Sequence, residues 1–340
     1  MSVPPHRFRT TMTDLSDFLD TGALPAQAGA LIERFRDADP AVRRIALLDL
    51  ADIEDPALVP VLIAALRNDP SADVRFEAAQ ILAAWEQAPV VEALCTALLD
   101  NDRKVREAAA QSLSELKDPD AAAVLRRWVE HADPFVKQSA LRGLRELRDA
   151  DAFDPALAAL ANPHSGVRLE AVSVLGWLKD PRALAGLAAL ATTDTGADVR
   201  RAAVGALGFA PSGDRGVAAA LIRALRDDAW QVREEAATTL GKLRAPATAE
   251  LIAALDDDYW QVRLRATRAL GQLRDADAAP AVTGLLTHTI SNLRKEAALA
   301  LGEFRIRASL DALRTALEDP DPEVRKAVRI AIQQIEEATA

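Results

Sequence analysis

Apolar and polar positions along this chain form blocks that recur about every 31 residues. In each block an apolar segment is followed by a short polar break and then by a second segment with apolar residues at spacings of three and four, as at Val232, Ala236, Leu240 and Leu243. That spacing lines one face of an α-helix. Strand-like alternation does not appear between the blocks. Each block is therefore predicted to be a helix, a turn and a second helix.

A Val-Arg pair, or a close substitute, marks the second helix of every block. Neighbouring marks lie 30 to 33 residues apart, and such regular spacing predicts one stack of about ten structural repeats in place of two globular domains. The ten marks are Val42-Arg43, Val74-Arg75, Val105-Arg106, Val136-Lys137, Val167-Arg168, Val199-Arg200, Val232-Arg233, Val262-Arg263, Leu293-Arg294 and Val324-Arg325.

A second recurrent position lies six residues before the basic residue of each mark. It carries Asp in most repeats and a hydrogen-bonding residue in all of them. The fork of an arginine suits a carboxylate and turn carbonyls together, so we expect each arginine to bind the Asp of its own or the adjacent repeat. This predicts a structural ladder. Catalytic or metal-binding carboxylates are disfavoured, because single copies one repeat apart do not converge. The positions are Asp37, Asp69, Asp100, His131, Asn162, Asp194, Asp227, Asp257, His288 and Asp319.

Two further patterns indicate how the helices begin and pack. Asp-Pro recurs at the block boundaries, for example at Asp39-Pro40 and Asp133-Pro134. Asp can accept hydrogen bonds from free helix N–H groups, and Pro fits the first helical position. Gly241 and Gly271 follow Leu near the ends of second helices, two residues before the last apolar position. We interpret these glycines as points of close packing more than as helix C-caps.

Composition and charge argue against nucleic-acid-binding, metal-binding and membrane-spanning classes of protein. The formal net charge is -10, so the chain lacks the broad basic footprint that nucleic-acid binding needs. The single cysteine, Cys95, lies in an apolar stretch and is expected to be a buried filler. No Cys/His metal spacing, apolar signal core or membrane-length apolar run occurs. We expect a cytoplasmic monomer without cofactor, metal, nucleic acid or membrane partner.

The repeated motif resembles the HEAT repeat. Its form at Asp227-Asp228-Ala229-Trp230-Gln231-Val232-Arg233 and again at Asp257 to Arg263 resembles the subtype named after phycobilisome lyases, the PBS-lyase HEAT-like repeat. The resemblance covers about residues 24–337. It implies an all-α fold, a right-handed α-solenoid superhelix, with second helices on the concave surface. Members include bilin lyases, scaffolds and a metal-dependent hydroxylase with His-Glu pairs. None of His6, His131, His164 and His288 precedes Glu, which excludes the hydroxylase type.

Departures from the period predict the domain organisation. Residues 1–23 are expected to form an N-terminal tail and a partial capping helix, and residues 24–340 the solenoid, because exposed end repeats need protection. The period stretches around residues 192–198 and again at 210–216, and the second stretch is the most Gly-rich in the chain. We expect a kink or hinge there.

Any partner surface should lie where the repeats differ, at large apolar residues on the side of a second helix that faces away from the core. Trp177, Phe209 and Leu169 fall in adjacent repeats and predict one patch, unless the superhelix twist covers them. Trp230, Tyr259 and Trp260 predict a second patch, unless they pack across the repeat junction. The candidate partner-binding residues are Phe76, Leu169, Trp177, Phe209, Trp230, Tyr259, Trp260 and Leu264.

Three functions remain open from the sequence. The leading hypothesis is a non-enzymatic scaffold or adaptor that binds a protein, since the sequence contains no recognisable nucleophile–base pair or phosphate loop. A bilin lyase, or its chaperone subunit, is the alternative, and its only basis is the repeat subtype. Nucleic-acid binding by a helical-repeat protein is the third.

Overall fold

The computed structural model describes residues 28–339, and in that range the chain forms twenty α-helices and no β-strand. The predicted tail and capping helix at 1–23 lie outside the described residues. The chain divides into two compact units, Met1–Ala156 and Leu157–Ala340. Each unit is described by itself.

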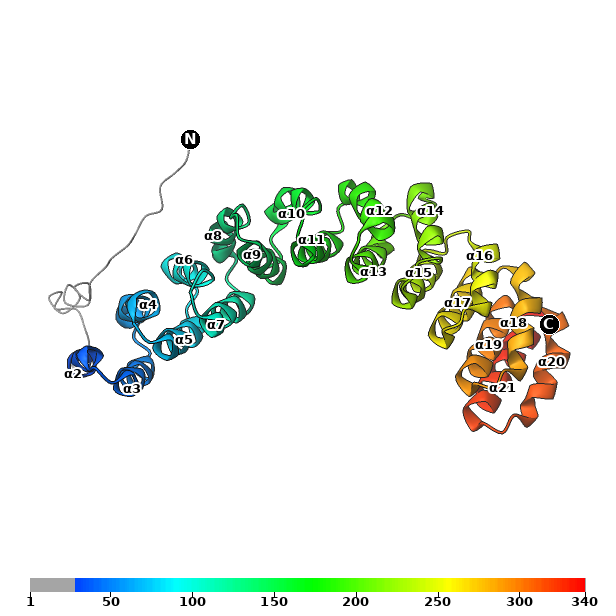
Figure 1. Cartoon of the computed structure of the whole chain (residues 1–340). Helices are drawn as coiled ribbons and strands as arrows, with labels where there is room; N and C mark the ends of the chain where they lie inside the picture. Colours follow the sequence, from blue (N-terminus) through cyan, green and yellow to red (C-terminus); the bar gives the residue numbers. More distant parts are fainter. Residues whose placement is uncertain (1–27, 340) are drawn as a thin grey trace. The chain divides into compact units, whose positions relative to one another are not determined.

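The first unit stacks helix pairs in which even-numbered helices form one layer and odd-numbered helices the other (Figure 1). Second helices pack on second helices, as α5 does on α7, and first helices on first helices, as α4 does on α6. The helices are α2 (Ala28–Glu33), α3 (Pro40–Ala51), α4 (Val59–Asn68), α5 (Ala72–Ile81), α6 (Ala88–Ala97), α7 (Arg103–Ser114), α8 (Ala122–Trp128), α9 (Pro134–Glu146) and the start of α10 (Phe153–Ala159).

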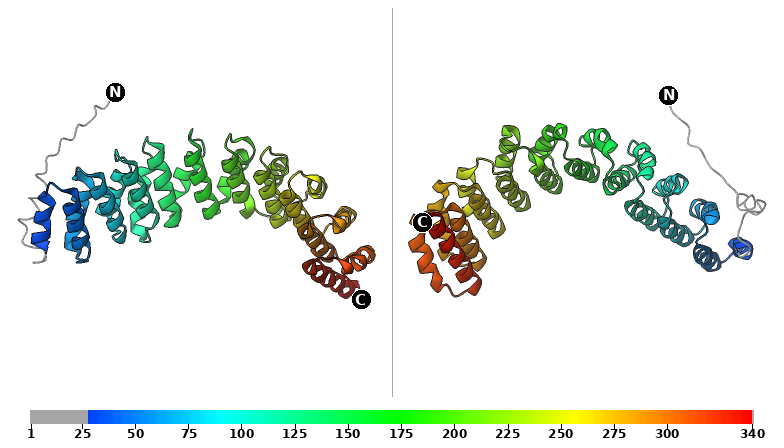
Figure 2. Two further views of the ribbon diagram at one scale, coloured as in Figure 1. Left: turned by 60° about the horizontal axis from the view of Figure 1, so that its bottom comes forward. Right: turned by 180° about the vertical axis from the view of Figure 1, so that it is seen from behind.

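The second unit is also built of two layers of helices, and Figure 2 shows them from two further sides. Its helices are α11 (Ser165–Leu178), α12 (Leu184–Thr193), α13 (Ala197–Ala206), α14 (Arg215–Ala224), α15 (Trp230–Leu243), α16 (Thr248–Ala253), α17 (Trp260–Leu273), α18 (Ala279–Gly284), α19 (Ser291–Phe304), α20 (Leu310–Thr315) and α21 (Pro322–Thr339). Short 3₁₀ turns extend several helix ends, such as η8 (Leu207–Phe209) after α13.

The ten helix pairs confirm the prediction of an α-solenoid built from ten two-helix repeats. Every Val-Arg mark lies near the start of an odd-numbered helix. The apolar residue of the mark is buried in nine repeats, and only Val42 in α3 is half-buried. Residues 210–214 form a loop between η8 and α14, with Gly213 at a φ of 89°, and Arg215 and Gly216 already belong to α14. The hinge there stays a prediction.

Most Asp-Pro pairs lie at helix starts as expected, whereas Asp154-Pro155 lies within α10. Asp39 accepts a hydrogen bond from the Ala41 amide at 2.9 Å at the start of α3, and Asp133 accepts from the Phe135 amide at 2.8 Å at the start of α9. The glycines after Leu are packing points, as predicted. A Cβ added at Gly241 would lie 2.8 Å from Ala269 Cα of the next second helix. The helix ends instead use Arg244 and Arg274 in the left-handed region, at φ of 47° and 57°.

Candidate functional site

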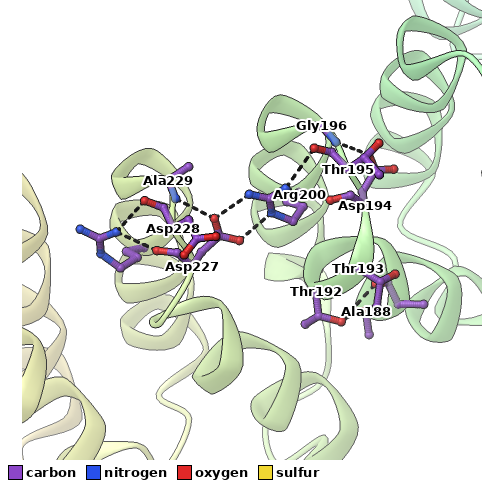
Figure 3. A network of polar contacts seen from close by, with 12 residues as sticks. Ala188, Thr192, Thr193, Asp194, Thr195, Gly196, Arg200, Asp227, Asp228 and Ala229 are labelled. Carbon is purple, nitrogen blue, oxygen red and sulfur yellow. Dashed lines mark hydrogen bonds and ion pairs between the residues drawn. The ribbon is translucent and has the colours of Figure 1, made fainter.

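The charged ladder runs along the turns between first and second helices, and Figure 3 shows one rung of it. Arg200 Nε and Nη2 donate to Asp227 Oδ2 and Oδ1 at 2.6 and 2.7 Å. Arg200 Nη1 donates to the Asp194 carbonyl oxygen at 2.8 Å. The carboxylate therefore comes from the next repeat and the carbonyl from the arginine's own repeat. The sequence left both repeats open as the source of the carboxylate.

Six arginines make this two-bond fork to a carboxylate, so the ladder is architecture, as the sequence predicts. The pairs are largely shielded from solvent; the side chains of Arg168 and Asp194 are 11% and 1% exposed. Each acceptor Asp also accepts an amide hydrogen bond two residues later, as Asp227 does from Ala229 at 2.9 Å. The pairs are Arg43–Asp69, Arg75–Asp100, Arg168–Asp194, Arg200–Asp227, Arg233–Asp257 and Arg294–Asp319.

The arginine forks keep the ladder carboxylates ionised. The hydrogen bond from Arg294 lowers the pKa of Asp319 below its ordinary value, against the opposing effect of burial. At Asp194 burial is the largest influence and acts to raise the pKa, but the hydrogen bonds from Arg168 and the Gly196 amide outweigh it and the pKa is lowered. A carboxylate whose ionised form is this well bonded serves to hold two repeats together.

The arginine fork is missing at His131, Asn162 and His288. At Asn162 the preceding mark carries Lys137 in place of arginine, and its Nζ donates to the Val129 carbonyl oxygen at 2.8 Å. His131 and His288 keep the turn, because Nδ1 of each accepts the amide hydrogen of the residue two positions later, at 3.1 and 3.0 Å. Neither imidazole accepts the arginine fork. Arg263 donates only to the Asp257 carbonyl oxygen, at 2.9 Å, and its Nε is buried without a hydrogen-bond partner. Arg106 likewise donates only to the Asp100 carbonyl oxygen, at 3.0 Å.

The gap at His288 predicts a stabilising substitution. His288→Asp should supply the carboxylate that Arg263 lacks and raise the free energy of unfolding by about 1 kcal/mol, because an orphaned buried donor costs roughly that much or more. Burial, together with the charges of Arg263 and Arg294, lowers the pKa of His288. The two arginine charges favour an anion at this position, while burial opposes any charge. Urea unfolding at pH 7 measures the gain. The Asn variant keeps the turn acceptor without the charge, and an equal gain from it would contradict the explanation.

The predicted partner-binding residues differ in exposure. Trp177, Tyr259 and Trp260 are exposed, at 42%, 45% and 36%. The other five are half-buried: Phe76, Leu169, Phe209, Trp230 and Leu264.

The two predicted patches of the second unit have different geometry. Trp230 packs on Tyr259 of the next repeat, with ring centroids 5.4 Å apart and planes 13° apart, and the guanidinium carbon of Arg233 lies 5.7 Å from the Tyr259 ring centroid. Part of this aromatic surface is thus used between repeats, and Tyr259 and Trp260 remain its exposed members. Phe209, in contrast, lines a hollow between second helices.

This hollow, which we call the second-helix groove, lies on α11, α13, η8 and α15. It has a volume of about 250 Å³. Small residues line much of it, and Phe209 and two lysines complete it: Gly176, Gly205, Gly208, Phe209, Lys179 and Lys242. A Cβ added at Gly208 would lie 3.0 Å from Lys242 Nζ, and one at Gly205 would lie 3.1 Å from Glu235 Oε1. The missing side chains of the glycines therefore make room for these charged groups.

Sequence reasoning did not place the groove, although a signal was present. Lys242 stands ten residues after Val232, in the row that holds Trp177 and Phe209 in the two preceding repeats. Glu235 also faces this region, and burial raises its pKa above the ordinary value.

Three other expectations concern chemistry. Cys95 is fully buried, as predicted, and burial raises the pKa of its thiol, so the nucleophilic thiolate is disfavoured. Over residues 28–339 no three His, Cys, Asp or Glu side chains gather in a way that could hold a metal ion. In the same range no helix has the length and apolar character needed to cross a membrane.

Comparison with known proteins gives a consistent result for sequence and fold. The family described as HEAT repeats matches residues 28–88, 59–145, 128–208, 197–259 and 248–333. These matches cover most of the chain and do not single out the phycobilisome-lyase subtype. None of the curated proteins compared with the chain matches it.

Several solved structures are similar in fold. An engineered protein is 22% identical over 92% of this chain and 99% of its own, with a TM-score of 0.54. The Escherichia coli protein YibA is 18% identical over 79% of this chain and 98% of its own, with a TM-score of 0.57. Kap95p, in a structure with RanGDP, is 14% identical over 91% of this chain and 50% of its own, with a TM-score of 0.64. At these identities the likeness concerns the fold alone.

Proposed function

Because this chain belongs to the HEAT-repeat family, we propose that it is a non-enzymatic scaffold or adaptor that binds a partner protein on the surface of its second helices. The observation that carries the proposal is the second-helix groove with Phe209 in its lining and the exposed Trp177 on α11. Tryptophan and other aromatic side chains contribute strongly to protein interfaces when they fill or flank a pocket.

The size of the groove favours a protein side chain as its occupant. Pockets for small molecules and cofactors usually enclose about 300–1,000 Å³, whereas this groove has about 250 Å³. Its glycines bring backbone to the surface, and Lys179 and Lys242 supply hydrogen-bond donors beside the apolar Phe209. Such a mixture suits one anchoring side chain of a partner with polar contacts around it.

Similarity of fold supports the same class of function. Kap95p binds RanGDP in its structure, so a stack of this fold can present a protein-binding surface. The alternative of a bilin lyase or its chaperone subunit retains only the repeat subtype as support. We therefore expect a protein partner. A cytoplasmic location and a monomeric state stay predictions from the sequence.

Affinity purification of the intact protein, followed by mass spectrometry, tests the proposal. The Trp177→Ala/Phe209→Ala variant should bind the main partner at least tenfold more weakly than wild type, since truncating a hot-spot aromatic residue costs about 2 kcal/mol or more. The Tyr259→Ala/Trp260→Ala variant is the matched control, because it removes two exposed aromatic side chains at the start of α17, outside the groove. Both variants should keep the wild-type circular dichroism. Partners that survive the first substitution in a folded protein would place the binding surface elsewhere.

A further inference from the structure

The break in the ladder at Arg106 coincides with a surface hollow of the first unit. The hollow has a volume of about 480 Å³ and lies where α6 ends and α7 and α9 begin. Arg106 lines it together with four apolar residues: Leu98, Leu99, Pro134 and Phe135. The side chain of Leu99 is 43% exposed, which is unusual for a large apolar residue of this chain.

The other charged groups of the hollow are already engaged. Glu107 accepts a hydrogen bond from Arg103 Nε at 2.7 Å. Asp133 accepts hydrogen bonds from the amides of Phe135 and Val136, at 2.8 and 3.1 Å, at the start of α9. Arg106, in contrast, has no carboxylate partner among the described residues, and only its Nη1 is used.

The chain itself shows what such an arginine binds. Six equivalent arginines donate Nε and Nη2 to one carboxylate; Arg75, in the preceding repeat, does so to Asp100 at 2.7 and 2.8 Å. The carboxylate is missing opposite Arg106 because the position carries His131, whose ring stacks on Trp128 with centroids 5.7 Å apart. The Nε and Nη2 donors of Arg106 are thus left without an internal acceptor.

We propose that this hollow binds an acidic side chain, flanked by apolar residues, of a partner protein. The carboxylate takes the two donors of Arg106 that a ladder Asp takes elsewhere, and the flanking groups contact Leu98, Leu99 and Phe135. Charge complementarity favours this occupant, since a carboxylate that meets a guanidinium in two parallel bonds is held more strongly than a neutral amide. The inference rests on the proposed function in assuming a protein partner, but it concerns a surface separate from the second-helix groove.

Matched peptides test the site directly. The probes are acetyl-Leu-Glu-Phe-amide and its Gln twin, with binding to the full chain measured by ligand-observed NMR at low salt. Wild type should bind the Glu peptide about tenfold more tightly than the Gln peptide. A third probe, the acetylated Gln peptide with a free terminal carboxylate, should bind no better than its amide. Preferential binding of this third probe would overturn the side-chain assignment in favour of a chain terminus.

Substitution at His131 makes the test specific. His131→Asp should supply an internal carboxylate to Arg106 and abolish the preference for Glu over Gln. His131→Asn also removes the imidazole and keeps a turn acceptor, as Asn162 does, so it should retain the preference. Arg106→Gln should lose the preference, and His288→Asp, which fills the other gap left by a histidine, should leave it unchanged. Equal binding of the first two peptides to wild type, or a preference that survives in His131→Asp, would overturn the proposal. Partner capture by the second-helix groove would be unaffected in either case, so the two proposals fail separately.

Discussion

Asp194→Ala should lower the free energy of unfolding by about 3 kcal/mol, because it breaks a shielded ion pair and leaves the other charge behind. Asp194 accepts hydrogen bonds from Arg168 Nε and Nη2 at 2.6 and 2.8 Å and from the Gly196 amide at 2.8 Å. Without the carboxylate, Arg168 keeps only the carbonyl oxygens of Asn162 and Pro163. Urea unfolding of the full chain, followed by circular dichroism, measures the loss.

Glu303→Ala is the control for burial. The Arg274–Glu303 pair has the same nitrogen–oxygen distance of 2.6 Å as the Arg168–Asp194 pair, but its side chains are 48% and 41% exposed. Exposed pairs contribute about 0–1 kcal/mol, so this variant should stay within roughly 0.5 kcal/mol of wild type. Asp194→Asn should lie between the two, since it keeps an acceptor for the Gly196 amide. Equal losses in Asp194→Ala and Glu303→Ala would show that shielding does not set the strength of the ladder.

Some features of the ladder could be predicted from the sequence and others could not. The repeat length, the helix pairs and the Asp–Arg spacing are local features, and all were readable from the position of Val199-Arg200 and its equivalents. The pairing of each Arg with a particular Asp could not be predicted from the sequence. Whether the side chain of Arg200 binds the carboxylate of Asp194 or that of Asp227 depends on how neighbouring repeats are stacked. That stacking is a tertiary property. It gives Arg200 the backbone of its own repeat and the carboxylate of the next.

The candidate surfaces were less predictable for a related reason. Helical periodicity correctly placed Trp177 on an exposed face, but it could not show that Trp230 stacks on Tyr259, since the two rings come from different repeats. The second-helix groove depends on what is missing at Gly205 and Gly208 and on what neighbouring α15 places over them. The hollow at Arg106 had a visible signal, His131 in an Asp position. That signal could be interpreted only once the structure showed that an Asp at position 131 would have bound Arg106.

Replacing glycine by alanine should change the free energy of unfolding in opposite directions at two helical positions of the second unit. A Cβ added at Gly271 of α17 would lie 3.0 Å from both Cα and Cβ of Ala300 in α19, where backbone cannot easily give way. Gly271→Ala should therefore lower the free energy of unfolding by about 1–2 kcal/mol, because overpacking costs roughly 1–3 kcal/mol and the gain in helix propensity offsets only part of it.

Gly284→Ala isolates the propensity effect. Gly284 ends α18, and nothing lies within 4 Å of the position its Cβ would take. Its replacement by Ala should raise the free energy of unfolding, by at most about 1 kcal/mol. Urea midpoints with unchanged slopes test both signs. A double variant with Ala300→Gly should recover part of the Gly271→Ala loss, because it removes one of the two atoms in contact. These results would show that Gly271 allows the close approach of α17 and α19. If Gly271→Ala instead raised the free energy of unfolding, these helices could separate without cost.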